Sequence, residues 1–386
     1  MPSFTRFAAA ALLFSGIAAA ASEIPPEQQL RGALDAAAAG ELDTATDALR
    51  DLVRRQPNFR LAELLYGDML AARSGVHHRP RLASDDPRLT DLKQEAQLRL
   101  RAWQDAPAPG LQPDALLQVS PAVKRVVFVD LPGGRVYLLD HRRDSFEVLH
   151  SYYAGIGKSG FHKSNAGDNR TPVGVYQING WIDGHKLPKL YGAGALTLNY
   201  PNLWDQRQHR SGHGIWLHGV PPETYVRAPR SSEGCVTLAN ADLLSLKPFV
   251  AAGHTPVVLS DAPNWVAPDS LKAERDEFLK RIEDWRQQWS SRNTDAYLAY
   301  YSRDFATDGM DKAAFAAFKR RVNTEKRFIQ VRLRDIELLR YPGPQPMVLA
   351  RYTQDYRSDN FARSTQKQQL WRKEDSGWKI VMEENR

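Results

Sequence analysis

The residues best suited to chemistry are a single cysteine, Cys235, and a histidine 17 positions before it, His218. A thiol attacks a carbonyl carbon only as the thiolate, so it needs a base or a cation nearby. The segment between them contains Pro221, Pro222 and Pro229, which favour an excursion that leaves a strand and returns beside it. The spacing therefore predicts that sulfur and imidazole meet, with Cys235 as nucleophile and His218 as general base.

The neighbouring residues fit this interpretation. Gly219 could accept the Nδ1 proton of His218 on its carbonyl and so set the tautomer. Gly234 allows a tight turn, and the amides of Gly234 and Cys235 could face a developing oxyanion, worth about 3–4 kcal/mol in a comparable hydrolase. Ser232 is expected to support this loop and to border the substrate. The alternative, a cysteine that is only a small core residue, fits a lone thiol in such a motif less well.

The first 21 residues have the pattern of a secretory signal peptide. Arg6 is their only charged residue, an apolar run extends from Phe7 to Ala21, and small residues at its end offer cleavage sites. The run is short for a membrane span, with an uncleaved anchor as the alternative. We therefore expect a periplasmic protein without a stable membrane span after cleavage. A lone thiol cannot form an internal disulfide in an oxidising compartment, which supports a chemical role for it.

The composition limits the classes of partner that the protein is expected to bind. The net charge of +7, or +6 without Arg6, favours anionic partners. Lysine and arginine are spread along the chain, so we expect cell-wall material rather than nucleic acid. No histidine, cysteine and carboxylate cluster has metal-ligand spacing, and the adjacent His77 and His78 are interpreted as loop residues. The sequence predicts an enzyme without metal or cofactor.

Changes in hydrophobic periodicity predict a multidomain chain. Residues 22–106 are predicted to be α-helical and resemble a tetratricopeptide-like hairpin. Such a unit cannot bury its apolar face alone, so it should pack on the next domain or on a second copy, as in a homodimer. Residues 107–123 are rich in proline and are predicted as a linker. Residues 124–262 are predicted to be mostly β, and residues 270–386 to be α+β.

The C-terminal region begins with a predicted amphipathic helix over residues 271–292. It places Phe278, Ile282, Trp285 and Trp289 on one face, which we expect to be core. Together with a Gly-Trp-Lys-Ile stretch at residues 377–380, this pattern resembles the nuclear-transport-factor-2-like (NTF2-like) cone fold. We expect the terminal domains to mediate assembly or to hold the wall substrate.

The central region resembles the YkuD-type L,D-transpeptidase catalytic domain. The resemblance rests on His218-Gly219, on the Ser232-x-Gly234-Cys235 motif and on a second motif over residues 167–176. It implies a β-rich domain that attacks the bond between the third, L-centred residue and the fourth, D-residue of a peptidoglycan stem peptide. An acyl-enzyme forms on the cysteine, and an amine resolves it by transpeptidation or water does so by hydrolysis.

The sequence departs from the commonest family motif at two positions. Glu233 stands where many relatives have histidine, and Thr237 where they have an arginine expected to bind a substrate carboxylate. Arg227, Arg230 and Arg170 are the candidates to replace that arginine in substrate binding. The layout resembles a subfamily with a C-terminal NTF2-like domain, some of whose members look like L,D-carboxypeptidases that influence cell shape. Transpeptidase, carboxypeptidase and a wall-binding protein that has lost its chemistry all stay open.

Several other residues are weaker candidates. Asp168 and Arg170 are interpreted as stabilising a turn before Pro172, and His213 as a structural residue on the strand of His218. Four aromatic residues could line a substrate groove or belong to the core: Trp181, Tyr191, Tyr200 and Trp204.

Overall fold

The computed structural model describes residues 24–74, 86–143, 145–307 and 309–385. The predicted signal peptide (residues 1–21) and His77 and His78 lie outside these described residues. The chain divides into two compact units, one formed by residues 1–57 and 62–79 and the other by residues 58–61 and 80–386. Among the described helices, none combines the length and the apolar character needed to cross a membrane.

The N-terminal region is helical, as predicted. It contains α1 (Pro26–Ala38), α2 (Leu42–Arg55) and α3 (Arg60–Arg73). Helices α1 and α2 pack against each other and bury Leu30 of α1 and Leu49 of α2. Gly40, at a φ of +82°, permits the turn between them, because this backbone conformation favours a residue without a Cβ atom. A fourth helix, α4 (Pro87–Gln104), begins the second unit.

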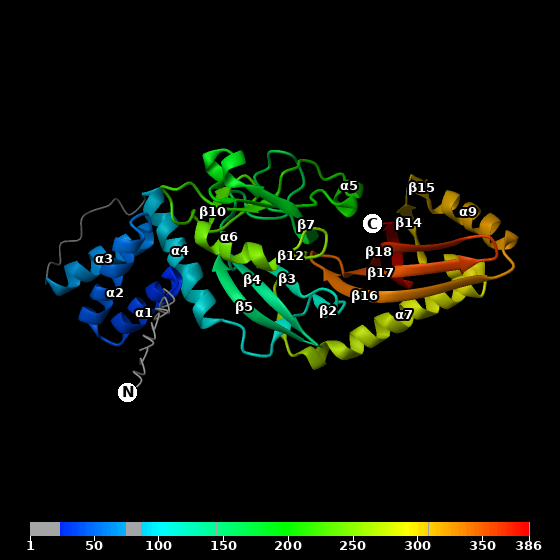
Figure 1. Ribbon diagram of the computed structural model, residues 1–386, viewed down its shortest axis with the longest axis horizontal. Helices are drawn as coiled ribbons and strands as arrows, with labels where there is room; N and C mark the ends of the chain where they lie inside the picture. The colour runs from blue at the N-terminus through cyan, green and yellow to red at the C-terminus, as the bar shows by residue number, and fades with distance from the viewer. Residues whose placement is uncertain (1–23, 75–85, 144, 308, 386) are drawn as a thin grey trace, which may run out of the picture. The chain divides into compact units, whose positions relative to one another are not determined.

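The central region forms an eight-stranded sheet in the order β11-β9-β8-β7-β12-β3-β4-β5 (Figure 1). Helix α6 (Asn240–Leu246) covers one face, where Leu243 and Leu246 join the same apolar core as Val127 and Val257 of the sheet. The mostly β prediction is confirmed. The strands are β3 (Arg125–Asp130), β4 (Arg135–Arg142), β5 (Ser145–Tyr153), β7 (Gly174–Asp183), β8 (Gly194–Leu198), β9 (Trp216–His218), β11 (Val236–Thr237) and β12 (Pro256–Ser260). Between them lie the short strands β6 (Ile156–Gly157) and β10 (Arg230–Ser232), which pair with each other, and helix α5 (Leu203–Arg207).

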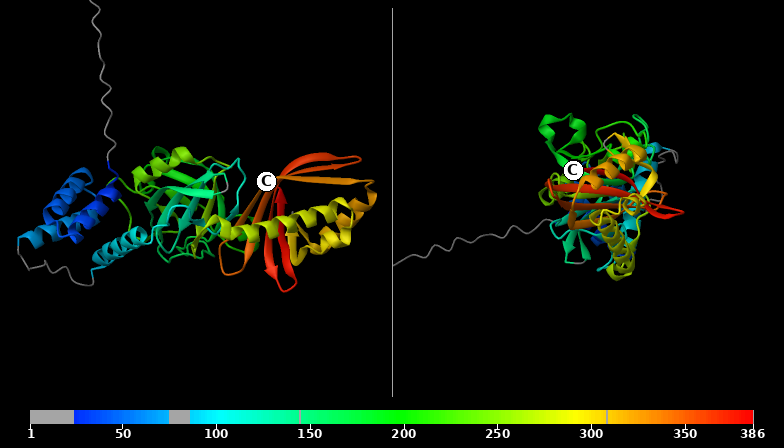
Figure 2. Two further views of the ribbon diagram at one scale, coloured as in Figure 1. Left: turned by 90° about the horizontal axis from the view of Figure 1, so that it is seen from below. Right: turned by 90° about the vertical axis from the view of Figure 1, so that its right-hand side faces the viewer.

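The C-terminal region is α+β, as predicted. Helix α7 (Lys272–Ser290) lies along the sheet (Figures 1 and 2) and buries Phe278, Ile282, Trp285 and Trp289 against sheet residues such as Trp371. The core assignment for these four residues is confirmed. The remaining elements are α8 (Thr294–Leu298), β14 (Tyr301–Thr307), β15 (Met310–Asp311), α9 (Lys312–Glu325), β16 (Ile329–Tyr341), β17 (Met347–Ser358), β18 (Ala362–Glu374) and β19 (Gly377–Asn385).

The segment predicted as a linker, residues 107–123, has ordered structure. Strand β1 (Gln112–Pro113) pairs with β13 (Trp265–Val266), and β2 (Leu116–Gln118) is the edge strand of the C-terminal sheet beside β16. Leu116 and Leu117 are fully buried there. Burial of these two side chains outweighs the turn-forming tendency of the prolines around them.

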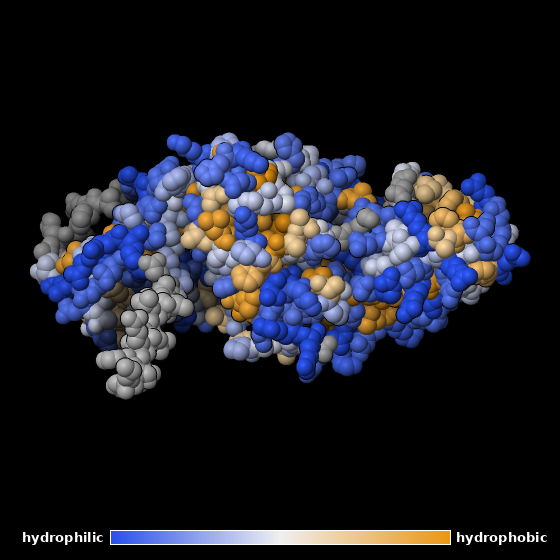
Figure 3. Space-filling view, viewed as in Figure 1, coloured by the Kyte–Doolittle hydropathy of each residue, from blue (hydrophilic) through white to orange (hydrophobic). Residues whose placement is uncertain are grey.

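The surface is mostly polar, with a few exposed apolar side chains (Figure 3). On the central domain these include Leu244 of α6 and Val148 of β5, and on the C-terminal domain Phe318 of α9 and Phe361.

Candidate active site

The register of strands β9 and β11 places His218 and Cys235 on the same face of the sheet. The two strands are parallel, with Val236 opposite Leu217 and Thr237 opposite His218. Leu217 and Val236 point into the apolar core. Because side chains alternate along a strand, His218 and Cys235 point the other way, and Cys235 stands one residue before β11.

The imidazole of His218 is held by the backbone that follows it. Its Nδ1 atom lies 2.7 Å from the Gly219 carbonyl oxygen. A carbonyl can only accept, so Nδ1 carries the proton and Nε2 is left as the basic nitrogen. The ring is buried, and burial lowers the pKa of His218 to about 4, with the charge of Arg227 acting in the same direction. The imidazole is therefore neutral at pH 7.

Asn240 shapes the chain around Gly219 and was not foreseen from the sequence. Its Oδ1 atom accepts hydrogen bonds from the amides of Ala193 (2.8 Å) and Val220 (3.1 Å), and its Nδ2 atom donates to the Val220 carbonyl (2.8 Å). A Cβ atom on Gly219 would overlap Asn240 Oδ1. Glycine at position 219 therefore lets the backbone lie close to Asn240. This packing positions the Gly219 carbonyl that orients the imidazole.

The thiol of Cys235 is protonated at rest. It donates to the carbonyl of Gly214 over 3.3 Å. Burial raises the pKa of Cys235 to about 11, against the opposing effects of a hydrogen bond from the Trp216 backbone and of the charges of Arg227 and Lys163. The thiol and the imidazole, which share a face of the sheet, are thus both neutral at rest.

The loop before Cys235 depends on Gly234 and Ser232. Gly234 has a φ of +125°, and a Cβ atom there would lie 2.7 Å from the Arg170 carbonyl oxygen. The buried Ser232 hydroxyl donates to the Cys235 carbonyl (2.6 Å) and accepts from the Gly234 amide (3.1 Å). The Gly234 amide, expected as an oxyanion donor, is therefore occupied at rest, and Ser232 faces the loop rather than a substrate.

The three candidate arginines lie in different surroundings. Arg227 is half-buried, donates to the Ser231 carbonyl (2.9 Å), and its charge acts on both His218 and Cys235. Arg170 and Arg230 are exposed, and the Arg170 guanidinium donates to the Phe161 carbonyl (3.1 Å). Arg227 is thus the candidate whose charge reaches the reacting pair.

Neither departure from the family motif brings a positive charge to the thiol. Glu233 is exposed, and its charge slightly raises the pKa of Cys235. Thr237 is buried, and its hydroxyl oxygen has no hydrogen-bond partner among the described residues.

Tyr191 is the member of the aromatic group that reaches the site. Its ring packs edge-on against His218, with centroids 4.9 Å apart, and contacts Trp216 at 5.1 Å. Burial, followed by the nearby Cys235 and Glu233, raises the pKa of Tyr191. Tyr200 and Trp204 are core residues instead. His213 was expected on the strand of His218. It is exposed and precedes β9, so the predicted strand position is wrong.

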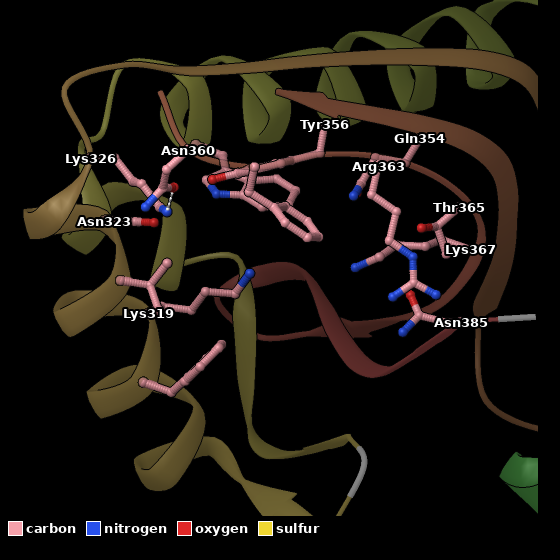
Figure 4. A pocket seen from close by; sticks show the side chains of 14 residues that line it. Lys319, Asn323, Lys326, Gln354, Tyr356, Asn360, Arg363, Thr365, Lys367 and Asn385 are labelled. Atoms are coloured by element: carbon pink, nitrogen blue, oxygen red, sulfur yellow. Dashed lines mark hydrogen bonds between the residues drawn. The ribbon is translucent and has the colours of Figure 1, made fainter. Parts of the chain in front are cut away.

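A separate cavity of about 480 Å³ opens in the C-terminal domain (Figure 4). Lys319 of α9 points into it with 9% of its surface exposed, and its ammonium lies 4.3 Å from the Trp289 ring centroid. Burial, then the charge of Lys367, lowers the pKa of Lys319 to about 7. Among the described residues no hydrogen-bond acceptor reaches this ammonium, whereas Lys367 donates to Glu383. The buried Gln354 Oε1 on the cavity wall also lacks a partner within the described part of the chain.

Two family models match the sequence. Residues 124–259 match the L,D-transpeptidase catalytic domain, YkuD, and residues 277–384 match the Cds6 C-terminal NTF2-like domain. The chain therefore carries the catalytic domain of the L,D-transpeptidase family followed by an NTF2-like domain.

Solved structures share this layout. Bd1075 from Bdellovibrio bacteriovorus is 29% identical, with a TM-score of 0.63 over 71% of this chain and 98% of its own. The helical cell shape determining protein Pgp2 from Campylobacter jejuni is 21% identical, with a TM-score of 0.58 over 76% of this chain and 99% of its own. The likeness to Pgp2 shows the fold. No curated protein matches the chain.

Proposed function

We propose that the chain is an exported L,D-transpeptidase in which Cys235 is the nucleophile and His218 the general base. The observation that carries this proposal is the shared face of the two side chains, with His218 Nδ1 bound to the Gly219 carbonyl. That bond leaves Nε2 to take a proton. The predicted signal peptide and the peptidoglycan-acting family support a periplasmic location.

The chemistry follows from the neutral resting pair. His218 Nε2 takes the proton of the Cys235 thiol as sulfur attacks the carbonyl carbon of the third residue of the stem peptide. The carbon–nitrogen bond to the fourth, D-residue breaks, and its nitrogen leaves with the proton from His218. A thioester remains on Cys235. An acceptor amine then attacks the thioester carbon and restores the thiol.

Two groups are assigned to the transition state. The amide of Cys235 is the oxyanion donor, since the Gly234 amide is engaged by Ser232. Arg227 is the cation that stabilises negative charge at the site and binds a substrate carboxylate, while Arg170 and Arg230 contact the substrate at the surface. These assignments rest on burial and on the charges that act at Cys235.

Hydrolysis of the same thioester, an L,D-carboxypeptidase activity, is the second candidate. It is favoured by Thr237, which removes the usual arginine after the cysteine, and by the likeness to Pgp2, a protein described as determining helical cell shape. A role in cell shape would follow from trimming stem peptides.

Purified muropeptides with the full chain test these proposals. Mass spectrometry should show a 3→3 cross-linked dimer or an exchanged D-amino acid for a transpeptidase, and a tripeptide with free D-alanine for a carboxypeptidase. Cys235→Ala and His218→Ala should each abolish turnover while leaving the melting temperature close to that of the parent. Turnover that survives in Cys235→Ala would contradict the proposed chemistry, and a folded parent that binds muropeptide without turnover would favour a wall-binding role.

The cavity of the C-terminal domain fits the proposed role of that domain in holding wall substrate. A buried ammonium without an acceptor leaves a hydrogen-bonding need that a carboxylate of a stem peptide would meet. Muropeptide binding to Cys235→Ala should therefore weaken about tenfold, roughly 1.4 kcal/mol, when Lys319→Met is added. Arg321→Gln, an exposed charge on the same helix, serves as the control. Equal affinities in both variants would remove the cavity from substrate binding.

A further inference from the structure

The turn between β6 and β7 is built around an ion pair that the catalytic scheme does not use. The Lys163 ammonium is buried and donates to Asp168 Oδ1 (2.7 Å) and to the Asn165 carbonyl (3.0 Å). Asp168 also accepts from the amides of Ser164 (2.8 Å), Asn165 (2.9 Å) and Arg170 (3.0 Å). Burial alone would raise the pKa of Asp168, but these bonds hold it at about 2. Asp168 is thus a carboxylate at every physiological pH.

This turn touches the backbone on both sides of the thiol. Its Arg170 carbonyl lies against Gly234, directly before Cys235. Its other side is bonded to Ser211, whose hydroxyl accepts from the Ala166 amide (3.0 Å) and whose amide donates to the Ser164 carbonyl (2.9 Å). The next residues, 212–214, lead to the Gly214 carbonyl, which accepts a hydrogen bond from the Cys235 thiol.

The side chain of Lys163 lies against the segment that leads to the thiol's acceptor. A Cβ atom placed on Gly212 would lie 3.3 Å from Lys163 Cε. Two residues later, the Gly214 carbonyl accepts from the thiol. A buried cation at this point interacts with a forming thiolate through protein rather than through water, which strengthens the interaction.

Lys163 and Arg227 act on the reacting pair in different ways. The charges that act on Cys235 come from Arg227, Lys163 and, with the opposite sign, Glu233. Arg227 also lowers the pKa of His218, so it favours the thiolate and disfavours the imidazolium at the same time. Its two effects on proton transfer from sulfur to imidazole oppose each other. The charge of Lys163 lowers the pKa of Cys235 and so favours the transfer.

We propose that Lys163, held in place by Asp168, is a positioning residue that stabilises the thiolate of Cys235. Asp168 acts one step further away: it fixes the ammonium and closes the turn that supports Gly234. This inference rests on the proposed function, because it concerns the nucleophile of that reaction. The stabilised species is the thiolate of Cys235 itself. Its stability can therefore be measured without peptidoglycan.

The test is the rate of alkylation by iodoacetamide as a function of pH, read by intact mass on the full chain. Cys235 is the sole cysteine of the sequence, so one added group reports on it. Lys163→Met should raise the pH midpoint of the alkylation curve by about one unit. Alkylation at a fixed pH below the midpoint then becomes about tenfold slower. Lys163→Arg should keep most of the parent rate. Lys158→Met, an exposed lysine nearby, is the matched control and should leave the curve in place.

Asp168→Asn separates positioning from charge by the sign of its effect. If Asp168 holds the ammonium in place, its loss lets Lys163 turn away and the pH midpoint of alkylation rises. If Asp168 only contributes its own negative charge, removing that charge lowers the pH midpoint. A downward shift would overturn the role of Asp168 even if Lys163→Met failed to fold.

Two outcomes would refute the role of Lys163. One is an unchanged alkylation curve in a folded Lys163→Met, with circular dichroism matching the parent. The other is an equal loss in Lys163→Arg and Lys163→Met, which would mark Lys163 as a packing residue. With muropeptide, Lys163→Met should lower kcat by about tenfold and leave KM near the parent value. A parent without turnover whose alkylation curve still responds to Lys163→Met would reject the proposed function and keep this inference.

Discussion

Acidification should destabilise the protein through His218. Its pKa falls from 6.5 to about 4 on folding because the ring is buried. Between these values the unfolded chain binds more protons than the folded one, so stability falls as the pH is lowered. The contribution is fully present above pH 6.5 and is lost as the pH approaches 4. At 1.36 kcal/mol for each pH unit, the loss amounts to about 3 kcal/mol at pH 4. His218 is 2% exposed, so solvent screens little of it.

Urea unfolding of the parent and of His218→Asn at pH 7.5 and pH 4 isolates this contribution. The carboxylates with a folded pKa of about 2, Asp168, Asp355 and Glu383, are present in both proteins and cancel in the comparison. The parent should lose about 3 kcal/mol more than the variant between the two pH values. In parallel, kcat/KM of the parent should fall on the acid side with a midpoint near pH 4. Equal losses in the two proteins, or an acid limb near pH 6.5, would refute a buried neutral imidazole.

Two further predictions concern single positions. Gly234→Ala should destabilise the fold by about 1–3 kcal/mol and abolish turnover, because its φ of +125° and the Arg170 carbonyl 2.7 Å from the added Cβ leave no relaxed alternative. Gly167→Ala, at a φ of +75° in open space, is the control and should cost about 1 kcal/mol and keep activity; thermal melting compares the two. Lys319→Met should stabilise the protein at pH 7 by up to about 4 kcal/mol, since the folded pKa of about 7 lies below 10.5, and this gain should vanish as the pH approaches 10.5. A gain that does not change with pH would contradict a desolvated ammonium.

The elements with strong periodicity could be predicted from the sequence. The apolar face of α7 repeats at helical spacing, and its four large side chains are indeed core. The same reasoning failed for residues 107–123, where proline signalled a linker. A three-residue strand such as β2 has no period to detect, and its pairing with β16, more than two hundred residues later, depends on tertiary structure.

In the candidate site, too, contacts between neighbouring residues could be predicted from the sequence, and contacts between distant segments could not. The contact of His218 with the Gly219 carbonyl joins adjacent residues, so local geometry is enough to anticipate it. Lys163 and Tyr191 come from segments well before Cys235 in the chain, and no local pattern connects them to it. Asn240 follows Cys235 closely in sequence, but its bonds to Ala193 and Val220 exist only in the folded chain. Asp168 was visible in the motif over residues 167–176, but only the folded turn shows that its partner is a buried lysine.

The neutral resting state sets what the surrounding charges can do. A preformed thiolate and imidazolium would both have to be buried, and the pKa values of about 11 for Cys235 and about 4 for His218 show that burial opposes each of them. Proton transfer therefore gains its driving force as the substrate carbonyl takes up the charge of the sulfur. A cation that acts equally on both partners changes this balance little, because it stabilises one product of the transfer and destabilises the other. A charge that lies closer to the sulfur than to the imidazole shifts this balance, and that is the role we propose for Lys163.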